Sequence, residues 1–247
     1  MKRYKLSVKT KNKKYSIIIG NNIIKNINNI LKKQKILFNK CLIVVDNNIP
    51  GKLVFNLKKN IKIKKIFIFK FKSSEKNKNY KSVNRIINLL FKQNFNRDDC
   101  LISLGGGITG DVSGFAASMY KRGIKFINIP TTLLAQVDSS IGGKTGVNNK
   151  YGKNLIGTFY QPDLVISDTL FLKSILKREI ISGYGEILKH SLISSKKNFL
   201  FLNKFRKKII ELESPFIEKA IFESCKIKKE VVQKDEKEKN LRKILNF

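Results

Sequence analysis

An apolar run that leads directly into three glycines constrains the fold of this chain more than any other feature. Residues 100–104 have the composition of a buried strand, Gly105-Gly106-Gly107 follows at once, and residues 112–119 form an apolar run of helical type. Glycines at such a turn let the backbone approach a phosphate, and the free N–H groups of the helix start supply hydrogen-bond donors. The G-x-G-x-x-G spacing from Gly105 to Gly110 therefore indicates a nucleotide site, although a tight turn without any ligand has the same pattern.

The rest of the chain divides into an alternating part and a helical part. Before and after the glycines, further short β-type runs alternate with helical patterns, which predicts βαβ units and a mostly parallel sheet. After Phe171 only helices are expected. We therefore predict an α/β domain over residues 1–170 and the start of an all-helical domain over residues 171–247. The expected strands are residues 15–19, 41–45, 66–71, 100–104, 125–129 and 164–167, and the expected helices include 82–93, 180–193, 198–212 and 215–235.

The charge of the chain is extreme, with 51 Lys and Arg against 18 Asp and Glu, or +33. Such an excess suggests nucleic-acid binding. However, residues 100–170 contain six Lys or Arg and four Asp, so the glycine-rich part is close to neutral. The excess accompanies many Asn, Ile and Phe residues, whose codons are A/T-rich, so base composition explains it more simply. We predict nonspecific adhesion to polyanions and no sequence-specific nucleic-acid function.

Two further features concern the location of the protein. The longest run without a charged residue or histidine is residues 126–137, shorter than a membrane-spanning helix, and the amino terminus has no apolar core of a signal peptide. Cys41, Cys100 and Cys225 are few and far apart, which favours buried reduced thiols over disulfides or a metal knuckle. A cytoplasmic protein without a membrane partner is expected.

Several polar residues have candidate roles in chemistry. Asp46 ends an expected strand before the glycines, which disfavours the common dehydrogenase arrangement, where the ribose-binding acid follows them. Lys144 lies between glycines, but Asp138 stands where a P-loop needs Gly, so an anion contact is the better interpretation. Glu186 and His190 share one helix face and could bind a metal. A single histidine on a helix is, however, more often a packing residue.

Taken together, the motifs resemble those of the 3-dehydroquinate synthase family. They occur in order over nearly the whole chain: Leu104-Gly105-Gly106-Gly107, Gly110-Asp111, Pro130-Thr131-Thr132 through Ser140, Gly142-Gly143-Lys144-Thr145, Gly152-Lys153-Asn154, Phe159-Tyr160-Gln161-Pro162, Gly185 to Lys189, Glu230-Val231-Val232, Asp235-Glu236, Leu241-Arg242 and Leu245-Asn246. The resemblance implies a Rossmann-like NAD-binding domain followed by a helical domain. It also implies a lyase that converts a heptulosonate 7-phosphate to 3-dehydroquinate in the shikimate pathway, with NAD and zinc or cobalt.

The family's functional residues can be placed on this sequence by the same motifs. The implied cofactor contacts are Asp46, Asn48, Glu75, Lys78, Gly106, Gly107, Ile108, Thr109, Gly110, Asp111, Thr131, Thr132, Lys144, Lys153, Phe171, Leu172, Lys173 and Ser174. The implied substrate contacts are Asp138, Lys144, Asn154, Lys189, Lys228, Arg242, Asn246 and, across a homodimer interface, Arg122. Glu186 is the implied metal ligand, and His190 becomes its neighbour.

The sequence departs from the family pattern after Phe247, where the family continues with a Gly-His-x-x-Gly-His segment that supplies a metal ligand. The resemblance therefore predicts a truncated chain that is inactive by itself. Two alternatives remain open. One is another NAD- and metal-dependent sugar-phosphate cyclase, which Asn154, Lys189, Arg242 and Asn246 disfavour. The other is an inactive remnant that binds nucleotide or polyanions.

Overall fold

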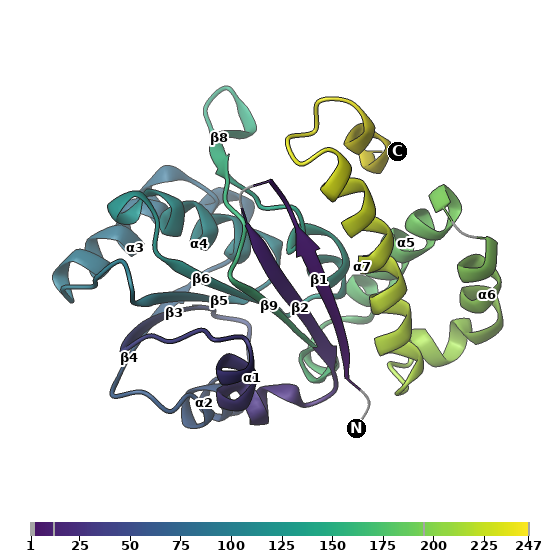
Figure 1. The fold of residues 1–247 in the computed structure, drawn as a ribbon, viewed down its shortest axis with the longest axis horizontal. Helices are drawn as coiled ribbons and strands as arrows, with labels where there is room; N and C mark the ends of the chain where they lie inside the picture. Colours follow the sequence, from purple (N-terminus) through teal and green to yellow (C-terminus); the bar gives the residue numbers. More distant parts are fainter. Residues whose placement is uncertain (1–2, 12, 195, 247) are drawn as a thin grey trace.

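A computed structural model of the chain describes residues 3–11, 13–194 and 196–246. Its main feature is a seven-stranded sheet with the strand order β1-β2-β9-β6-β5-β3-β4 (Figure 1). β1 is antiparallel to β2, and the other neighbours are parallel. The strands of this sheet are β1 (Tyr4–Lys9), β2 (Lys14–Gly20), β3 (Lys40–Asp46), β4 (Lys65–Phe71), β5 (Cys100–Gly105), β6 (Lys125–Pro130) and β9 (Leu164–Asp168).

Helices cover both faces of the parallel part of the sheet (Figure 1). Because side chains alternate along a strand, Cys100, Ile102 and Leu104 of β5 pack with the core of α1 (Ile27–Lys33) and α2 (Gly51–Asn60). Leu101 packs on the opposite face, with the core of α3 (Tyr80–Lys92) and α4 (Gly107–Met119). β5 is therefore buried on both faces, which explains its uninterrupted apolar run.

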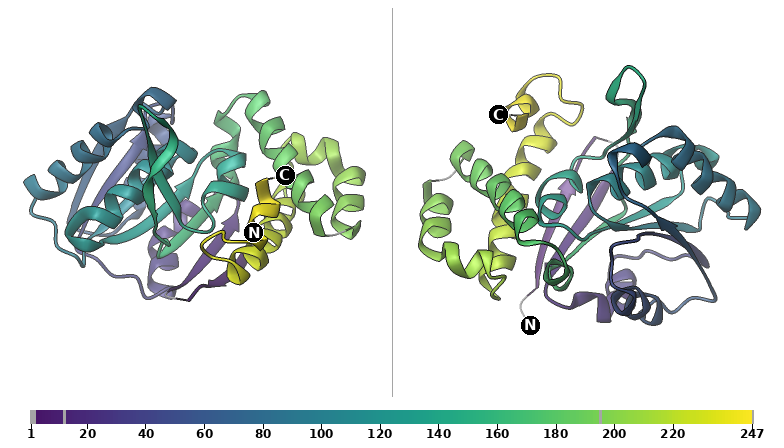
Figure 2. Two further views of the ribbon diagram at one scale, coloured as in Figure 1. Left: turned by 90° about the horizontal axis from the view of Figure 1, so that it is seen from above. Right: turned by 180° about the vertical axis from the view of Figure 1, so that it is seen from behind.

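Three helices form the second part of the molecule: α5 (Lys177–Ser194), α6 (Lys196–Ile210) and α7 (Phe216–Lys234). They stand beside the β1–β2 end of the sheet (Figures 1 and 2). One hydrophobic cluster joins the parts, because Val8 and Ile17 of the hairpin pack with Ile221 of α7. The two parts are also linked by a hydrogen bond of 2.9 Å from the Thr169 hydroxyl to the buried Glu218 carboxylate.

The α/β class and the expected strands and helices are confirmed, and the three cysteines are free and buried as predicted. Three strands were not expected. β1 adds an antiparallel edge strand, and β7 (Lys144–Asn149) pairs with β8 (Gly152–Phe159) in a separate two-stranded hairpin. No helix within the described ranges is long and apolar enough to cross a membrane.

Candidate functional site

The glycine loop lies where three parallel strands end. Val45 of β3 is paired with Leu104 of β5, and Gly105 with Pro130 of β6, so Asp46 reaches the same sheet edge as the glycines. α4 begins at Gly107, and its N-cap Gly106 provides no side-chain cap. The first N–H groups of this helix therefore remain available to an anion at the edge of the sheet.

Close packing at this turn requires glycine at Gly105 and leaves little room for a side chain at Gly107. A Cβ on Gly105 would lie 2.6 Å from Cβ of Thr109, and one on Gly107 would lie 3.1 Å from Oγ of Ser139. The tight turn thus explains Gly105 without a ligand. The arrangement also leaves the main chain unobstructed by side chains, which is what a close approach to a phosphate requires.

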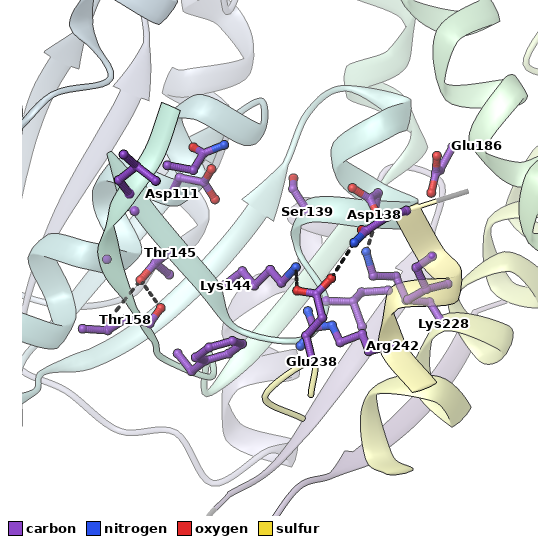
Figure 3. Close-up of a pocket in the computed structure, with 18 of the residues that line it drawn as sticks. Asp111, Asp138, Ser139, Lys144, Thr145, Thr158, Glu186, Lys228, Glu238 and Arg242 are labelled. Atoms are coloured by element: carbon purple, nitrogen blue, oxygen red, sulfur yellow. Dashed lines mark hydrogen bonds and ion pairs between the residues drawn. The ribbon is translucent and has the colours of Figure 1, made fainter. Parts of the chain in front are cut away.

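A cavity of about 600 Å³ opens between the sheet edge, the β7–β8 hairpin and the helical part (Figure 3). Its wall combines four cationic with four anionic side chains. Nine of the residues implied by the resemblance line it: Asp111, Asp138, Lys144, Asn154, Glu186, Lys189, Lys228, Arg242 and Asn246. The structure therefore brings together residues that are separated by up to 135 positions in the sequence.

Lys78 joins α4 to the β7–β8 hairpin beside this cavity. Its ammonium donates to Asp111 Oδ2 at 2.5 Å and to Asn154 Oδ1 at 2.6 Å, and the residue is 6% exposed. Burial raises the pKa of Asp111 to about 6, although Lys78 opposes this increase. The Asp111 carboxyl group therefore changes between its protonated and ionised forms near pH 6.

On the opposite wall, α7 presents a buried lysine to the segment that follows β6. The ammonium of Lys228 contacts the Asp138 carboxylate (Figure 3). Burial lowers the pKa of Lys228, whereas Asp138 raises it. An ammonium that is only 5% exposed but has access to a cavity can bind an anion strongly, because little water competes for it.

Glu186 lies on α5 between two basic side chains. Its Oε1 is 2.7 Å from Lys189 Nζ and 3.1 Å from His190 Nε2. Although burial raises the pKa of Glu186, the contacts with His190 and Lys189 lower it to about 2. One ligand atom each from Asp138, Glu186 and His190 lies within 4.8 Å of the others. The site therefore contains a group of ligands suitable for a metal.

The segment after α7 forms one wall of the cavity and is held by one aspartate. The Asp235 carboxylate accepts backbone N–H groups of Lys239, Asn240 and Arg242 at 2.8–3.1 Å. Arg242, which is 2% exposed, then donates to the carbonyl oxygen of Gly142 at 3.0 Å. A Cβ on Gly142 would lie 2.3 Å from Nη2 of Arg242, so this close contact requires glycine.

Sequence reasoning missed Glu238, whose carboxylate projects into the cavity (Figure 3). It contacts Lys144 and accepts from Asn246 Nδ2 at 2.9 Å. These contacts lower the pKa of Glu238, although burial raises it. No pattern marked this residue, because it lies in a run of alternating Lys, Asp and Glu that is typical of a solvated surface.

The other implied residues lie outside the cavity lining. Phe171 and Leu172 are fully buried in two hydrophobic clusters, so only their main chains could reach a cofactor. Arg122 lies in an open hollow at the opposite ends of the strands, with Arg97 and Lys125. Ile108, Thr109 and Gly110 lie in the first turn of α4, where Thr109 and Gly110 are buried. The remaining residues are on loops, short 3-10 helices and the hairpin: Asn48, Glu75, Thr131, Thr132, Lys153, Lys173 and Ser174.

Comparison with known proteins places this architecture in a family. Residues 68–182 match the model described as 3-dehydroquinate synthase N-terminal, and residues 183–247 match 3-dehydroquinate synthase C-terminal. A 3-dehydroquinate synthase from Prochlorococcus marinus subsp. pastoris is 43% identical over 254 aligned residues, which cover 100% of this chain and 69% of the relative. The chain belongs to the 3-dehydroquinate synthase family. A family member from Pelagibacter ubique is 67% identical, and the chain covers 66% of its length.

Among solved structures, a sugar-phosphate cyclase shares the fold of this 3-dehydroquinate synthase family member. It is 2-deoxy-scyllo-inosose synthase complexed with carbaglucose-6-phosphate, NAD+ and Co2+, with a TM-score of 0.88 and 26% identity. The alignment covers 99% of this chain and 66% of the cyclase. The chain thus spans about two thirds of the length of these proteins.

Proposed function

We propose that this chain carries the NAD-binding residues and most of the substrate-binding residues of a 3-dehydroquinate synthase. Its reaction converts 3-deoxy-arabino-heptulosonate 7-phosphate to 3-dehydroquinate and phosphate. The observation that carries this proposal is the cavity beside the glycine loop, where Lys144, Lys228 and Arg242 converge from three separate segments. The 67% identity to the Pelagibacter enzyme, against 26% to the inosose synthase, favours this activity over that of another cyclase.

The sheet edge fits a dinucleotide. In the proposal the pyrophosphate lies on the N-terminus of α4, next to Gly106 and Gly107, and Asp46 accepts hydrogen bonds from a ribose. When bound, NAD would oxidise a substrate hydroxyl and later return the hydride. The protein contributes orientation, because β3, β5 and β6 fix these groups on one rigid edge.

The cavity fits a substrate with several hydroxyls and two anionic ends. Carboxylates such as Asp138 and Glu238 can accept hydrogen bonds from hydroxyls, whereas Lys144, Lys228 and Arg242 can hold a carboxylate or phosphate. As the phosphate leaves, negative charge develops at its oxygens, and preorganised cations stabilise it. Carboxylates and cationic side chains alternate around the same cavity, which favours an anion with several hydroxyl groups over an anion without them.

A divalent zinc or cobalt ion also fits the donor set. Glu186 is the ligand that we assign in the proposed enzyme, and it lies within 4.8 Å of two further donor atoms. Such an ion would polarise substrate hydroxyls as a Lewis acid. In a homodimer, Arg122 would reach the phosphate in the other subunit, which is consistent with its distance from the cavity of its own chain.

Titration calorimetry tests the proposal. We expect the chain to bind NAD, and in its presence to bind the heptulosonate phosphate more tightly than carbaglucose-6-phosphate. Lys228→Met should abolish substrate binding but not NAD binding, and Lys226→Met, an exposed lysine on the same helix, is the matched control. Turnover is measured as phosphate release by the chain joined to the C-terminal third of the Pelagibacter relative. Preference for carbaglucose-6-phosphate would favour the alternative cyclase.

A further inference from the structure

Arg242 is a buried cation that main-chain oxygens hold in place at the wall of the cavity (Figure 3). Its Nη1 donates to the carbonyl oxygen of Gly142 at 3.0 Å and to that of Glu236 at 2.6 Å. Among the residues that the structure describes, no carboxylate lies within 4.0 Å of the guanidinium. A buried charge without an opposite charge in contact is costly, so this arrangement requires an explanation.

The two carbonyl oxygens orient the guanidinium of Arg242 and leave its positive charge available. A carbonyl group is a dipole without net charge, so it does not neutralise the cation. Because Nη1 makes both contacts, they occupy neither Nη2 nor Nε, and these two groups can donate to two oxygens of one anion. A carboxylate or phosphate that enters the cavity therefore meets a cation whose orientation is already set.

The place of the Glu236 carbonyl depends on the side chain of the same residue. Its Oε1 accepts the Nε2–H of Gln161 at 2.9 Å, and its Oε2 accepts the backbone N–H of Lys11 at 3.3 Å. Gln161 follows β8, and Lys11 lies between β1 and β2, so the partners are 75 and 225 positions earlier in the sequence. The Glu236 carboxylate thus attaches the segment after α7 to the α/β part of the chain at two points.

The partners of Glu236 are themselves held firmly. Gln161 is 6% exposed, and a Cβ on Gly143 would lie 2.7 Å from its Cδ, so the glycine turn packs directly on this amide. Lys13 of the same hairpin turn donates to the carbonyl oxygen of Gln161 at 3.0 Å. The Gly142 N–H donates to the buried hydroxyl of Tyr15 at 3.4 Å. The amino-terminal hairpin therefore supports both carbonyl groups that hold Arg242.

We propose that Glu236 is a positioning residue, and that its carboxylate, held by Gln161 and the main chain of Lys11, sets the orientation in which Arg242 binds an anionic group of the substrate. This inference rests on the proposed function, in which Arg242 contacts that substrate. Glu236 does not line the cavity and acts through its own carbonyl oxygen. Two adjacent acids thus have separate tasks: Asp235 folds the segment on itself, and Glu236 attaches it to the sheet domain.

The orientation of Arg242 can be observed without any ligand. The 247-residue chain is labelled with 15N at arginine, its guanidinium resonances are recorded by NMR, and Arg242→Lys assigns the signals of this residue. A guanidinium held at Nη1 rotates slowly, so we expect separate resonances for Nη1 and Nη2. Glu236→Ala should merge them. Glu223→Ala, which removes another half-buried carboxylate from α7, is the matched control and should leave them separate.

An exchange of the two side chains tests whether the contact itself matters. In the double variant Gln161→Glu with Glu236→Gln, the amide at position 236 can donate to the carboxylate at position 161, and its oxygen can still accept the Lys11 N–H. We expect this variant to keep separate Nη1 and Nη2 resonances, as in the wild-type chain. If Glu236→Ala does not fold, Gln161→Met removes the amide donor alone and should merge the resonances in its place.

Calorimetry with the heptulosonate phosphate in the presence of NAD provides the second readout. Glu236→Ala should bind it about tenfold more weakly, the usual effect of losing one hydrogen bond to a charged group. The exchanged variant should bind it as the wild-type chain does, and NAD affinity should be the same in all variants. Separate resonances in Glu236→Ala, or merged resonances with unchanged substrate affinity, overturn the inference. If the wild-type chain does not bind the heptulosonate phosphate, the proposed function is wrong, and the NMR comparison alone decides whether Glu236 orients Arg242.

Discussion

The Lys78 ammonium lies 2.5 Å from the Asp111 carboxylate. This ion pair connects the segment that precedes α3 to the first turns of α4. Despite the ion pair, burial raises the pKa of Asp111 to about 6, above its ordinary value of 3.8. Desolvation therefore outweighs the attraction of Lys78 at this position.

This pKa predicts a pH dependence of stability. Between about pH 4 and pH 6, the folded chain keeps a proton on Asp111 that the unfolded chain has released, so the free energy of unfolding should decrease as pH rises through this window. Asp111→Asn should remove up to about 3 kcal/mol of this decrease. Urea unfolding at several pH values measures it. Asp98 is fully exposed, so Asp98→Asn should leave the dependence of the unfolding free energy on pH unchanged. If Asp111→Asn shows the same pH dependence as the wild-type chain, the prediction is wrong.

Asp46 is expected to determine NAD affinity. Its Oδ1 already accepts the Asn48 N–H at 3.0 Å, which orients the carboxylate at the end of β3. Asp46→Ala should weaken NAD binding by about tenfold or more, the usual effect of losing hydrogen bonds to a charged group. Calorimetric titration is the measurement, and Asp98→Ala is the control. If the Asp46→Ala and wild-type chains bind NAD equally, Asp46 does not belong to the site.

Two glycines on α5 should respond in opposite ways to the same substitution. A Cβ on Gly183 would lie 2.5 Å from Cβ of Leu133, whereas Gly185 has open space around it. Gly183→Ala should destabilise the chain by roughly 1–3 kcal/mol through overpacking. Gly185→Ala should stabilise it by about 0.5–1 kcal/mol, because alanine favours a helix. Chemical denaturation compares them, and a stabilising Gly183→Ala would show that α5 does not pack closely on Leu133.

Glu238 should compete with anionic ligands for Lys144. Glu238→Gln removes the internal anion and leaves Lys144 and Asn246 free to bind another, so affinity for inorganic phosphate should rise several-fold. Phosphate titration by calorimetry tests this, with the exposed Glu213→Gln as the control. Weaker phosphate binding by Glu238→Gln would mean that Glu238 organises the cationic groups instead of blocking them.

The parallel sheet could be predicted from the sequence because its strands are buried on both faces. Residues 100–104 and 41–45 have apolar side chains on each side, and the glycines mark where β5 ends. The β7–β8 hairpin has no such signal. Most side chains of β8 are exposed, so neither alternation nor an apolar run distinguishes this strand from a loop.

The site was predictable only where residues belonged to a recognisable motif. Lys228 and Arg242 could be named from the resemblance, but their burial follows from contacts across the fold with Asp138 and Gly142. The structural position of His190 could not be foreseen either. Its proximity to Glu186 follows from helix spacing, whereas Ser224 comes from another helix 34 residues later.

The position of β9 between β2 and β6 has a consequence for biosynthesis. β2 pairs with β9 and not with β3, so the amino-terminal hairpin finds its place in the sheet only after Leu164–Asp168 has left the ribosome. Before β9 is synthesised, β2 and β6 each have one edge without a partner strand, beside the apolar faces of the sheet. Contacts between residues this distant in sequence form slowly, and exposed edges favour aggregation. Nascent chains should therefore depend on protection during synthesis until β9 inserts.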